Sequence, residues 1–323
     1  MACGELARRL WLPGVLYVVL LLGGCATQTH GLLRAPPAGL PRQVELASTP
    51  FFAQERYQCG PATLAMALQA AGAGTAPEAL VSQVYVPERE GSLAIEMLAA
   101  GRRNGAVSVV IPPRLDALLA EVAGGTPVVV LQNLGFSWVP QWHYALVIGY
   151  DLDREEVVLR SGLTERLPMA MSTFERTWGR SDYWAMLALP PGRLPRTTDE
   201  PTTVTALIAF EKGSDPAKAR LAYEAALRKW PHNLALLMGR GNTAYAMGDR
   251  PAAAAAFRDV TTLHPDAAPA YNNLAIVLNE LGQVAAARQA AEKAIALGGP
   301  WREAALDTLK AIDAGQRSPG IKK

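Results

Sequence analysis

The sequence predicts an α+β domain followed by an all-α array of helical repeats. Residues 48–190 place helical patterns first and short apolar strands after them, which is typical of an α+β domain. Residues 200–314 are rich in alanine, and similar residues recur there at an offset of 34. A Pro-rich stretch, 191–199, lies between these two segments and predicts a linker.

The composition is that of a folded protein of about two domains. The chain has 323 residues, of which 50% are hydrophobic and 19% are charged, so disorder is disfavoured. The 31 basic and 29 acidic residues leave a net charge of +2, which argues against a nucleic-acid-binding protein. Three cysteines are too few for a disulfide framework in a chain of this length. Because a single stretch approaches the length of a bilayer core, the sequence also excludes a polytopic membrane protein.

Residues 1–24 have the pattern of an export signal. Arg8 and Arg9 precede an apolar run of 13 residues, 10–22. Such a run suits a signal peptide and is short for a spanning helix, which needs roughly 20 residues. The sequence therefore predicts an exported protein.

The end of this segment, Leu22-Gly23-Gly24-Cys25, resembles the lipobox of bacterial lipoproteins. The resemblance implies that Cys25 is lipidated and becomes the first residue of the mature chain. Since Ala26 stands where an inner-membrane protein usually has aspartate, it also implies attachment to the outer membrane, facing the periplasm. Acyl chains anchor a protein without spanning the bilayer, and residues 25–47 are predicted to form a tether. The alternative is an ordinary secretory signal with a chance cysteine.

Cys59 is then the one free thiol of the exported chain, because Cys3 leaves with the signal and Cys25 carries lipid. A helix is predicted from Pro61, where a proline in the first turn costs nothing. The positive end of that helix would lower the pKa of the thiol and favour the nucleophilic thiolate. Cys59 is either a buried core residue or a reactive group, and its position at a helix start favours the second.

His143 is the candidate partner for this thiol, since a nucleophilic cysteine needs a nearby base. His30 lies in the predicted tether, and His232 and His264 lie beside prolines in the repeats. His143 begins an apolar run that predicts a strand. A lone histidine at a strand start is often structural, but with Cys59 in the same chain the sequence favours a catalytic pair.

Three motifs together resemble the double-glycine (bacteriocin-processing) leader peptidase family, which has a papain-like fold. They are Gln54, the run 57–62 around Cys59, and the run 143–150 that begins at His143. The similarity covers about residues 48–190. It implies that Cys59 attacks a peptide carbonyl and His143 shuttles the proton. It also implies that a glutamine side chain and the cysteine backbone N–H stabilise the oxyanion.

The sequence departs from the family pattern at two positions. The family's oxyanion glutamine usually lies six residues before the cysteine, whereas Gln54 lies five before it; Gln58 is adjacent, but its side chain is expected to point away. Ser161 stands on the next strand where the family has aspartate, and its hydroxyl could accept a hydrogen bond from the Nδ1–H of the histidine without supplying charge. Asp151 and Asp153 are predicted at the far end of the histidine strand. The group that orients the histidine is therefore Ser161, a carboxylate not yet placed, or none.

The remaining elements of the domain follow from periodicity and turn residues. Ser92 is a plausible cap for the second predicted helix. Trp138 and Trp142, in the loop before His143, are either ordinary packing residues or lining of a substrate groove. The predicted helices are 76–84, 92–104 and 114–122, and the predicted strands are 107–111, 127–132, 143–150, 155–160, 165–170 and 183–189.

The spacing of small residues and prolines in residues 200–314 resembles that of the tetratricopeptide repeat. Pro231 and Pro265 are 34 residues apart, and so are Gly248 and Gly282. We expect units at 200–233, 234–267 and 268–301, a capping helix near 301–314 and a disordered tail at 315–323. Stacked repeats form a concave surface that commonly binds extended peptides or proteins. The candidate groove residues are Arg240, Asn242, Asn272 and Asn279.

The sequence predicts a lipid-anchored cysteine peptidase with a papain-like domain that acts on a peptide or protein in the periplasm, with repeats that bind the substrate or a protein partner. The alternative is a scaffold lipoprotein whose peptidase-like domain has weak or no activity. The sequence contains no metal-ligand cluster, phosphate loop or dinucleotide fingerprint, so neither a metal nor a cofactor is expected.

Overall fold

The computed structural model of the chain describes residues 26–54, 58–315 and 320–321. The predicted signal segment and Cys25 lie outside these residues. Within the described ranges, no helix is both long enough and apolar enough to cross a membrane.

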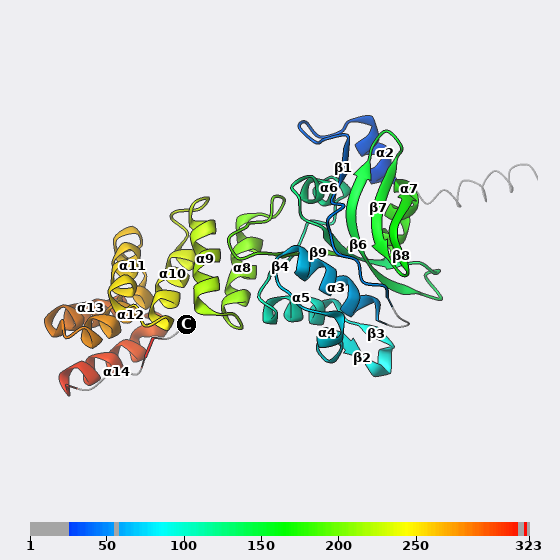
Figure 1. Ribbon diagram of the computed structural model, residues 1–323. Helices are drawn as coiled ribbons and strands as arrows, with labels where there is room; N and C mark the ends of the chain where they lie inside the picture. The colour runs from blue at the N-terminus through cyan, green and yellow to red at the C-terminus, as the bar shows by residue number, and fades with distance from the viewer. Residues whose placement is uncertain (1–25, 55–57, 316–319, 322–323) are drawn as a thin grey trace, which may run out of the picture.

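The N-terminal part is built on an antiparallel sheet of seven strands (Figure 1). The strand order is β4-β9-β5-β6-β7-β8, and β1 pairs with β6 beyond the stretch that pairs with β5. The strands are β1 (Gln43–Glu45), β4 (Val107–Val110), β5 (Val128–Asn133), β6 (Trp142–Asp151), β7 (Glu156–Ser161), β8 (Thr164–Ala170) and β9 (Ala185–Leu189).

Helices cover both faces of this sheet (Figure 1). Alternate residues of a strand point to opposite faces, so Val129 packs in one core and Val128 and Val130 pack in the other. The first face carries α3 (Cys59–Ala70), α4 (Pro77–Val84) and α5 (Ala94–Arg103), and the second carries α2 (Thr27–Arg34), α6 (Leu115–Ala123) and α7 (Met171–Gly179). A small hairpin of β2 (Tyr85–Val86) and β3 (Gly91–Ser92), with the turn η1 (Pro87–Arg89), joins α4 to α5.

The predicted α+β class is confirmed, and each predicted helix and strand of this domain is present within a few residues of its expected bounds. The expected cap at Ser92 is wrong, because Ser92 belongs to β3 and α5 follows Leu93 without a side-chain cap. Helix α7 and the β2–β3 hairpin were not among the predicted elements.

The described part of the predicted tether is not a free segment. Residues 27–34 form α2, where Leu32 is buried in the core. The buried carboxylate of Glu175 in α7 accepts hydrogen bonds from the backbone N–H groups of Gln28, at 2.9 Å, and Thr29, at 2.6 Å. These N–H groups belong to the first turn of α2, where a helix offers no partner of its own. A buried acceptor therefore fastens the N-terminal segment to the domain.

The C-terminal part is a succession of antiparallel helix pairs that extends away from the sheet (Figure 1). Short polar residues start four of the helices: Asp199, Asp215, Asn233 and Asp249 each accept backbone N–H groups with the side chain. The predicted all-α repeat region is confirmed. Its elements are α8 (Glu200–Glu211), α9 (Pro216–Leu227), α10 (Leu234–Ala246), α11 (Arg250–Leu263), α12 (Ala268–Glu280), α13 (Val284–Leu297), η2 (Gly299–Trp301) and α14 (Arg302–Asp313).

The predicted linker joins the two parts firmly. The carboxylate of Glu121 is buried and accepts the backbone N–H groups of Arg196 and Thr197, each at 2.8 Å. Beyond the linker, Phe210 of α8 lies in the same buried cluster as Val107 of β4. The first repeat therefore continues the hydrophobic core of the sheet.

Two of the predicted groove positions are buried between repeats. Asn242 is 7% exposed and Asn272 is 1% exposed. Asn242 accepts a hydrogen bond from Asn273 at 3.4 Å, and Asn272 accepts one from Thr308 at 2.9 Å. The prediction that they line a binding groove is wrong, because both amides connect neighbouring helices.

The other two groove candidates, Arg240 and Asn279, are less buried than these asparagines. Arg240 forms an ion pair with Asp259 at 2.7 Å, and Asn279 is half-buried. The described part of the tail includes Ile321, which packs against the core of the repeats.

Candidate active site

Cys59 is the first residue of α3, as the sequence predicts. Its neighbour Gly60 is needed because the chain packs closely there: a Cβ atom on Gly60 would lie 2.2 Å from the Ser92 hydroxyl oxygen. A residue with a side chain at this position would push the β2–β3 hairpin away from the helix start. The sequence Cys-Gly-Pro thus places a half-buried thiol at the beginning of a tightly packed helix.

The sulfur of Cys59 meets opposing influences. Burial raises the pKa of the thiol, while backbone hydrogen bonds from Tyr144, Gly60 and Cys59 itself lower it. Burial is the larger effect, so the pKa lies above its ordinary value. The expectation that the helix start would give a thiol of lowered pKa is therefore wrong, because burial outweighs the effects that lower it.

His143 is the second residue of β6, and its ring lies beside Ser161 at the end of β7. The His143 Nε2 atom is 2.9 Å from the Ser161 hydroxyl oxygen. Ser161 does contact the histidine, but through Nε2 and not through the predicted Nδ1. Burial lowers the pKa of the imidazole, because removal from water disfavours its charged form.

The two aspartates of the neighbouring turn do not serve this histidine. Asp151 uses its carboxylate to accept the backbone N–H groups of Asp153 and Arg154. Asp153 forms an ion pair with Arg42. Both interactions lie at the far end of β6, which agrees with the distance inferred from sequence.

Gln54 is buried, and its amide links three segments of the domain. Its Nε2 donates to the Thr63 hydroxyl at 3.0 Å and to the Tyr144 carbonyl at 3.4 Å. Its Oε1 accepts the backbone N–H of Gly162 at 3.0 Å. The oxyanion role of Gln54 remains a prediction.

A cavity of ≈ 930 Å³ brings the predicted residues together. Gln54, Cys59 and His143 all line it, whereas Ser161 contacts His143 without belonging to the lining. A space of this size can accommodate a small ligand or part of a peptide. The remaining lining residues are Arg89, Glu90, Gly91, Ser92, Leu93, Ala94, Leu131, Pro140, Gln141, Trp142, Tyr144 and Gly162.

The two loop tryptophans are not core residues. Trp142 lines the cavity and is 53% exposed. Trp138 is 78% exposed and stacks on Phe136, with ring centroids 4.9 Å apart. Neither side chain is therefore a core residue, and Trp142 lines the cavity; that this cavity is a substrate groove stays a prediction.

Sequence reasoning missed Thr63, which connects the cysteine helix to the histidine strand. Its hydroxyl donates to the Tyr144 carbonyl at 3.1 Å, next to His143 in the chain. Thr63 lies four residues after Cys59, and residues at this spacing share a helix face. That spacing was the available signal.

The described residues hold no group of three or more His, Cys, Asp or Glu side chains that could bind a metal ion.

Comparisons with known proteins agree with this architecture. Residues 46–186 match the model of the peptidase C39-like family, and residues 205–246 and 238–300 match that of the tetratricopeptide repeat. No curated protein matches the chain.

Two solved structures are each similar to about half of the chain. A C39-like peptidase from Bacillus anthracis shares 19% identity with a TM-score of 0.40, over 49% of this chain and 100% of that one. A double-glycine-motif protease from an AMS/PCAT transporter, solved in complex with the leader peptide, shares 20% identity with a TM-score of 0.34, over 44% of this chain and 91% of that one. The chain thus combines a peptidase C39-like domain at residues 46–186 with tetratricopeptide repeats that follow it.

Proposed function

We propose that this protein is a cysteine peptidase that hydrolyses a peptide or protein through Cys59 and His143. The observation that carries the proposal is the cavity of ≈ 930 Å³ that both residues line, with His143 held by Ser161 on its Nε2 side. A nucleophile, a base and a residue that orients the base are the parts that acyl transfer requires.

The pKa directions favour a resting pair of neutral thiol and neutral imidazole. In the tautomer with its proton on Nε2, His143 donates to Ser161 and keeps the Nδ1 lone pair as the base. The Cys59 proton passes to Nδ1 as the sulfur–carbon bond forms. The imidazolium then gives that proton to the leaving amine as the carbon–nitrogen bond breaks. Water hydrolyses the resulting thioester by the reverse sequence of proton transfers.

The oxyanion formed in each step needs hydrogen-bond donors. The backbone N–H of Cys59 belongs to the first turn of α3, where N–H groups have no partner within the helix. The Gln54 amide is the second proposed donor, since it lines the same cavity.

The proposal is tested with the full chain, purified in detergent and incubated with a library of fluorogenic peptides. Cys59→Ser and His143→Ala should each lower kcat/KM by a factor of roughly 10²–10⁴ for any peptide that the parent cleaves. Arg176→Ala, at an exposed position of α7, is the control that should keep the activity. Hydrolysis that survives Cys59→Ser would contradict the proposal.

A scaffold without catalysis is the second candidate, and two observations favour it. The pKa directions oppose a preformed thiolate, and the ring of His143 is held by a neutral hydroxyl. If no peptide is cleaved while the repeats bind a partner, the scaffold function is the correct one. Tetratricopeptide repeats commonly bind peptides or proteins, and we propose that role for this array in either case.

We further propose that lipid on Cys25 attaches the protein to the outer membrane, facing the periplasm. The support is the lipobox-like run that ends at Cys25, together with the apolar stretch before it. Labelling with a radioactive fatty acid should mark the parent chain and not Cys25→Ser, and the variant should leave the membrane fraction. Equal labelling of both chains would refute the assignment.

A further inference from the structure

Strand β7 ends with a buried arginine beside the residue that holds the catalytic histidine. Three apolar residues, 157–159, precede Arg160 in this strand, and Ser161 follows it. Arg160 is 4% exposed. A buried guanidinium is costly to remove from water, so it is found where its N–H groups have acceptors.

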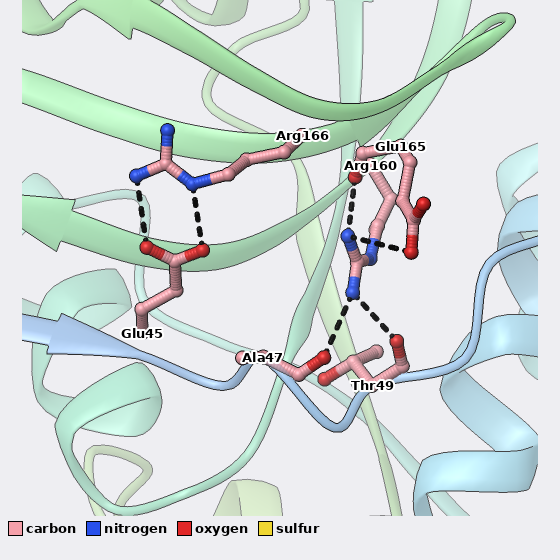
Figure 2. Close-up of polar contacts among 6 residues, drawn as sticks. All are labelled: Glu45, Ala47, Thr49, Arg160, Glu165 and Arg166. Carbon is pink, nitrogen blue, oxygen red and sulfur yellow. Dashed lines mark hydrogen bonds and ion pairs between the residues drawn. The ribbon is translucent and has the colours of Figure 1, made fainter.

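The acceptors of Arg160 come from two segments (Figure 2). Its Nη2 donates to the Thr49 carbonyl at 2.8 Å and to the Ala47 carbonyl at 3.0 Å. Its Nη1 donates to the Glu165 carbonyl and lies 3.7 Å from the Glu165 carboxylate. The guanidinium therefore bridges the turn at 47–49 and the β7–β8 hairpin.

A second tie lies on the other side of Ser161. The backbone N–H of Gln54 donates to the Gly162 carbonyl at 3.0 Å, and the backbone N–H of Gly162 donates to Gln54 Oε1 at 3.0 Å. Residues 160 and 162 thus hold the stretch 47–54, and Ser161 between them contacts His143. These bonds fix the position of Gln54, at the end of the stretch 47–54, relative to Ser161, at the end of β7.

We propose that Arg160 is a positioning residue for the Cys59–His143 site, and this inference rests on the proposed peptidase function. It touches neither the cavity nor the reacting atoms. Its planar fork donates to two carbonyls of one segment and one of the other, a geometry that a lysine ammonium does not reproduce. Without the fork, Ser161 and Gln54 shift relative to Cys59, and acyl transfer is sensitive to such displacements.

The same hairpin offers a matched control. Arg166 forms a two-pronged pair with Glu45, at 2.8 and 2.9 Å, and so joins β8 to β1 (Figure 2). This pair connects neighbouring parts of the same segments, but the Arg166 side chain is 53% exposed. An exposed pair of this kind is screened by water and holds its segments weakly.

The test compares Arg160→Lys, Arg160→Gln and Arg166→Gln in the full chain in detergent. For each chain, we would measure thermal melting, kcat and KM for a cleaved peptide, and the rate of Cys59 alkylation between pH 5 and pH 10. Arg160→Lys should lower kcat by roughly tenfold or more with KM within about twofold, and slow alkylation at neutral pH. Arg166→Gln should keep kcat, KM and the alkylation rate within about twofold of the parent values.

A double variant separates positioning from stability. If Arg160 acts through Ser161, the losses of kcat in Arg160→Lys and Ser161→Ala are not additive, because both disturb one arrangement. Additive losses, or unchanged kcat and alkylation in both Arg160 variants, would overturn the inference. It would also be overturned if both variants failed to fold, since Arg160 would then serve stability alone.

The alkylation measurement keeps this inference distinct from the proposed function. A parent chain that cleaves no peptide refutes the peptidase proposal. The dependence of Cys59 alkylation on Arg160 still decides whether Arg160 positions the pair.

Discussion

Burial favours the uncharged form of both Cys59 and His143. It raises the pKa of the thiol and lowers the pKa of the imidazole. Each shift favours the uncharged form, and Ser161 brings no charge that would oppose them. The site thus differs from one that holds an ion pair before substrate arrives.

The pH dependence of Cys59 alkylation tests this resting state. We expect the rate of reaction with iodoacetamide to rise with pH with a midpoint above the ordinary value of 9.0, because burial disfavours the thiolate. His143→Ala should slow the reaction at neutral pH, since the base is lost. Intact mass and rate would be followed with Cys59→Ser as the blank. A midpoint at or below 9.0 would contradict the raised pKa of the thiol.

Replacement of Ser161 tests how the histidine is held. In Ser161→Asp, a carboxylate beside Nε2 favours imidazolium, so the pKa of His143 should rise above that of the parent by about one unit or more. Ser161→Ala should leave the pKa low and reduce kcat, because the ring loses its partner. NMR titration of the His143 ring reports the pKa, and an equal pKa in all three chains would contradict the contact at 2.9 Å.

At the residue scale, the sequence predicts which side chains come together, but it does not predict the direction of the pKa shift of Cys59. The order of glutamine, helix-start cysteine and strand-start histidine locates residues that share one cavity. The pKa of Cys59 could not be predicted, because it depends on burial under β6 and the β2–β3 hairpin, which are distant in sequence. The contact of Ser161 with Nε2 also depends on the pairing of β6 and β7.

Among the elements, α2 shows how tertiary contacts override composition. Residues 25–47 have the Pro and Gly content of a tether, yet Glu175 supplies acceptors that allow a helix to start at Thr27. That carboxylate lies almost 150 residues away in sequence, so local patterns gave no indication of it. The strands and the repeat helices were predicted well because their periodicity is local.

Removal of the Glu175 carboxylate should loosen α2. Glu175→Ala leaves two backbone N–H groups in the first turn without their acceptor, and we expect the free energy of unfolding to fall by about 1–3 kcal/mol. Arg176→Ala, at the next position and exposed, should change it by less than about 0.5 kcal/mol. Urea denaturation measures both values, and equal effects would indicate that the cap contributes nothing.

Over the whole molecule, the peptidase-like domain and the first repeat share one hydrophobic core. Phe210 and Tyr223 of the repeats lie in the same buried cluster as Trp178 of α7. The Pro-rich composition of 191–199 predicts a linker, but it does not reveal that α8 packs on β4. The two parts should therefore unfold together.

Phe210→Ala tests this coupling. Loss of a fully buried phenyl ring should lower the free energy of unfolding by about 3–5 kcal/mol. Tryptophan fluorescence and far-UV circular dichroism should show one common transition, shifted equally. Ile208→Ala, on the exposed side of the same helix, should have a small effect. Two separate transitions in the parent chain would refute the shared core.

Helix α2 also limits how far the peptidase C39-like domain can lie from a lipid anchor on Cys25. If acyl chains sit on Cys25, Ala26 alone intervenes before a helix that is fastened to α6 and α7, and one extended residue spans roughly 3.5 Å. Such a short connection would hold the peptidase C39-like domain directly against the lipid headgroups. The domain would then diffuse in the plane of the bilayer and contact molecules at the membrane surface. It would not reach molecules that stay far from the membrane.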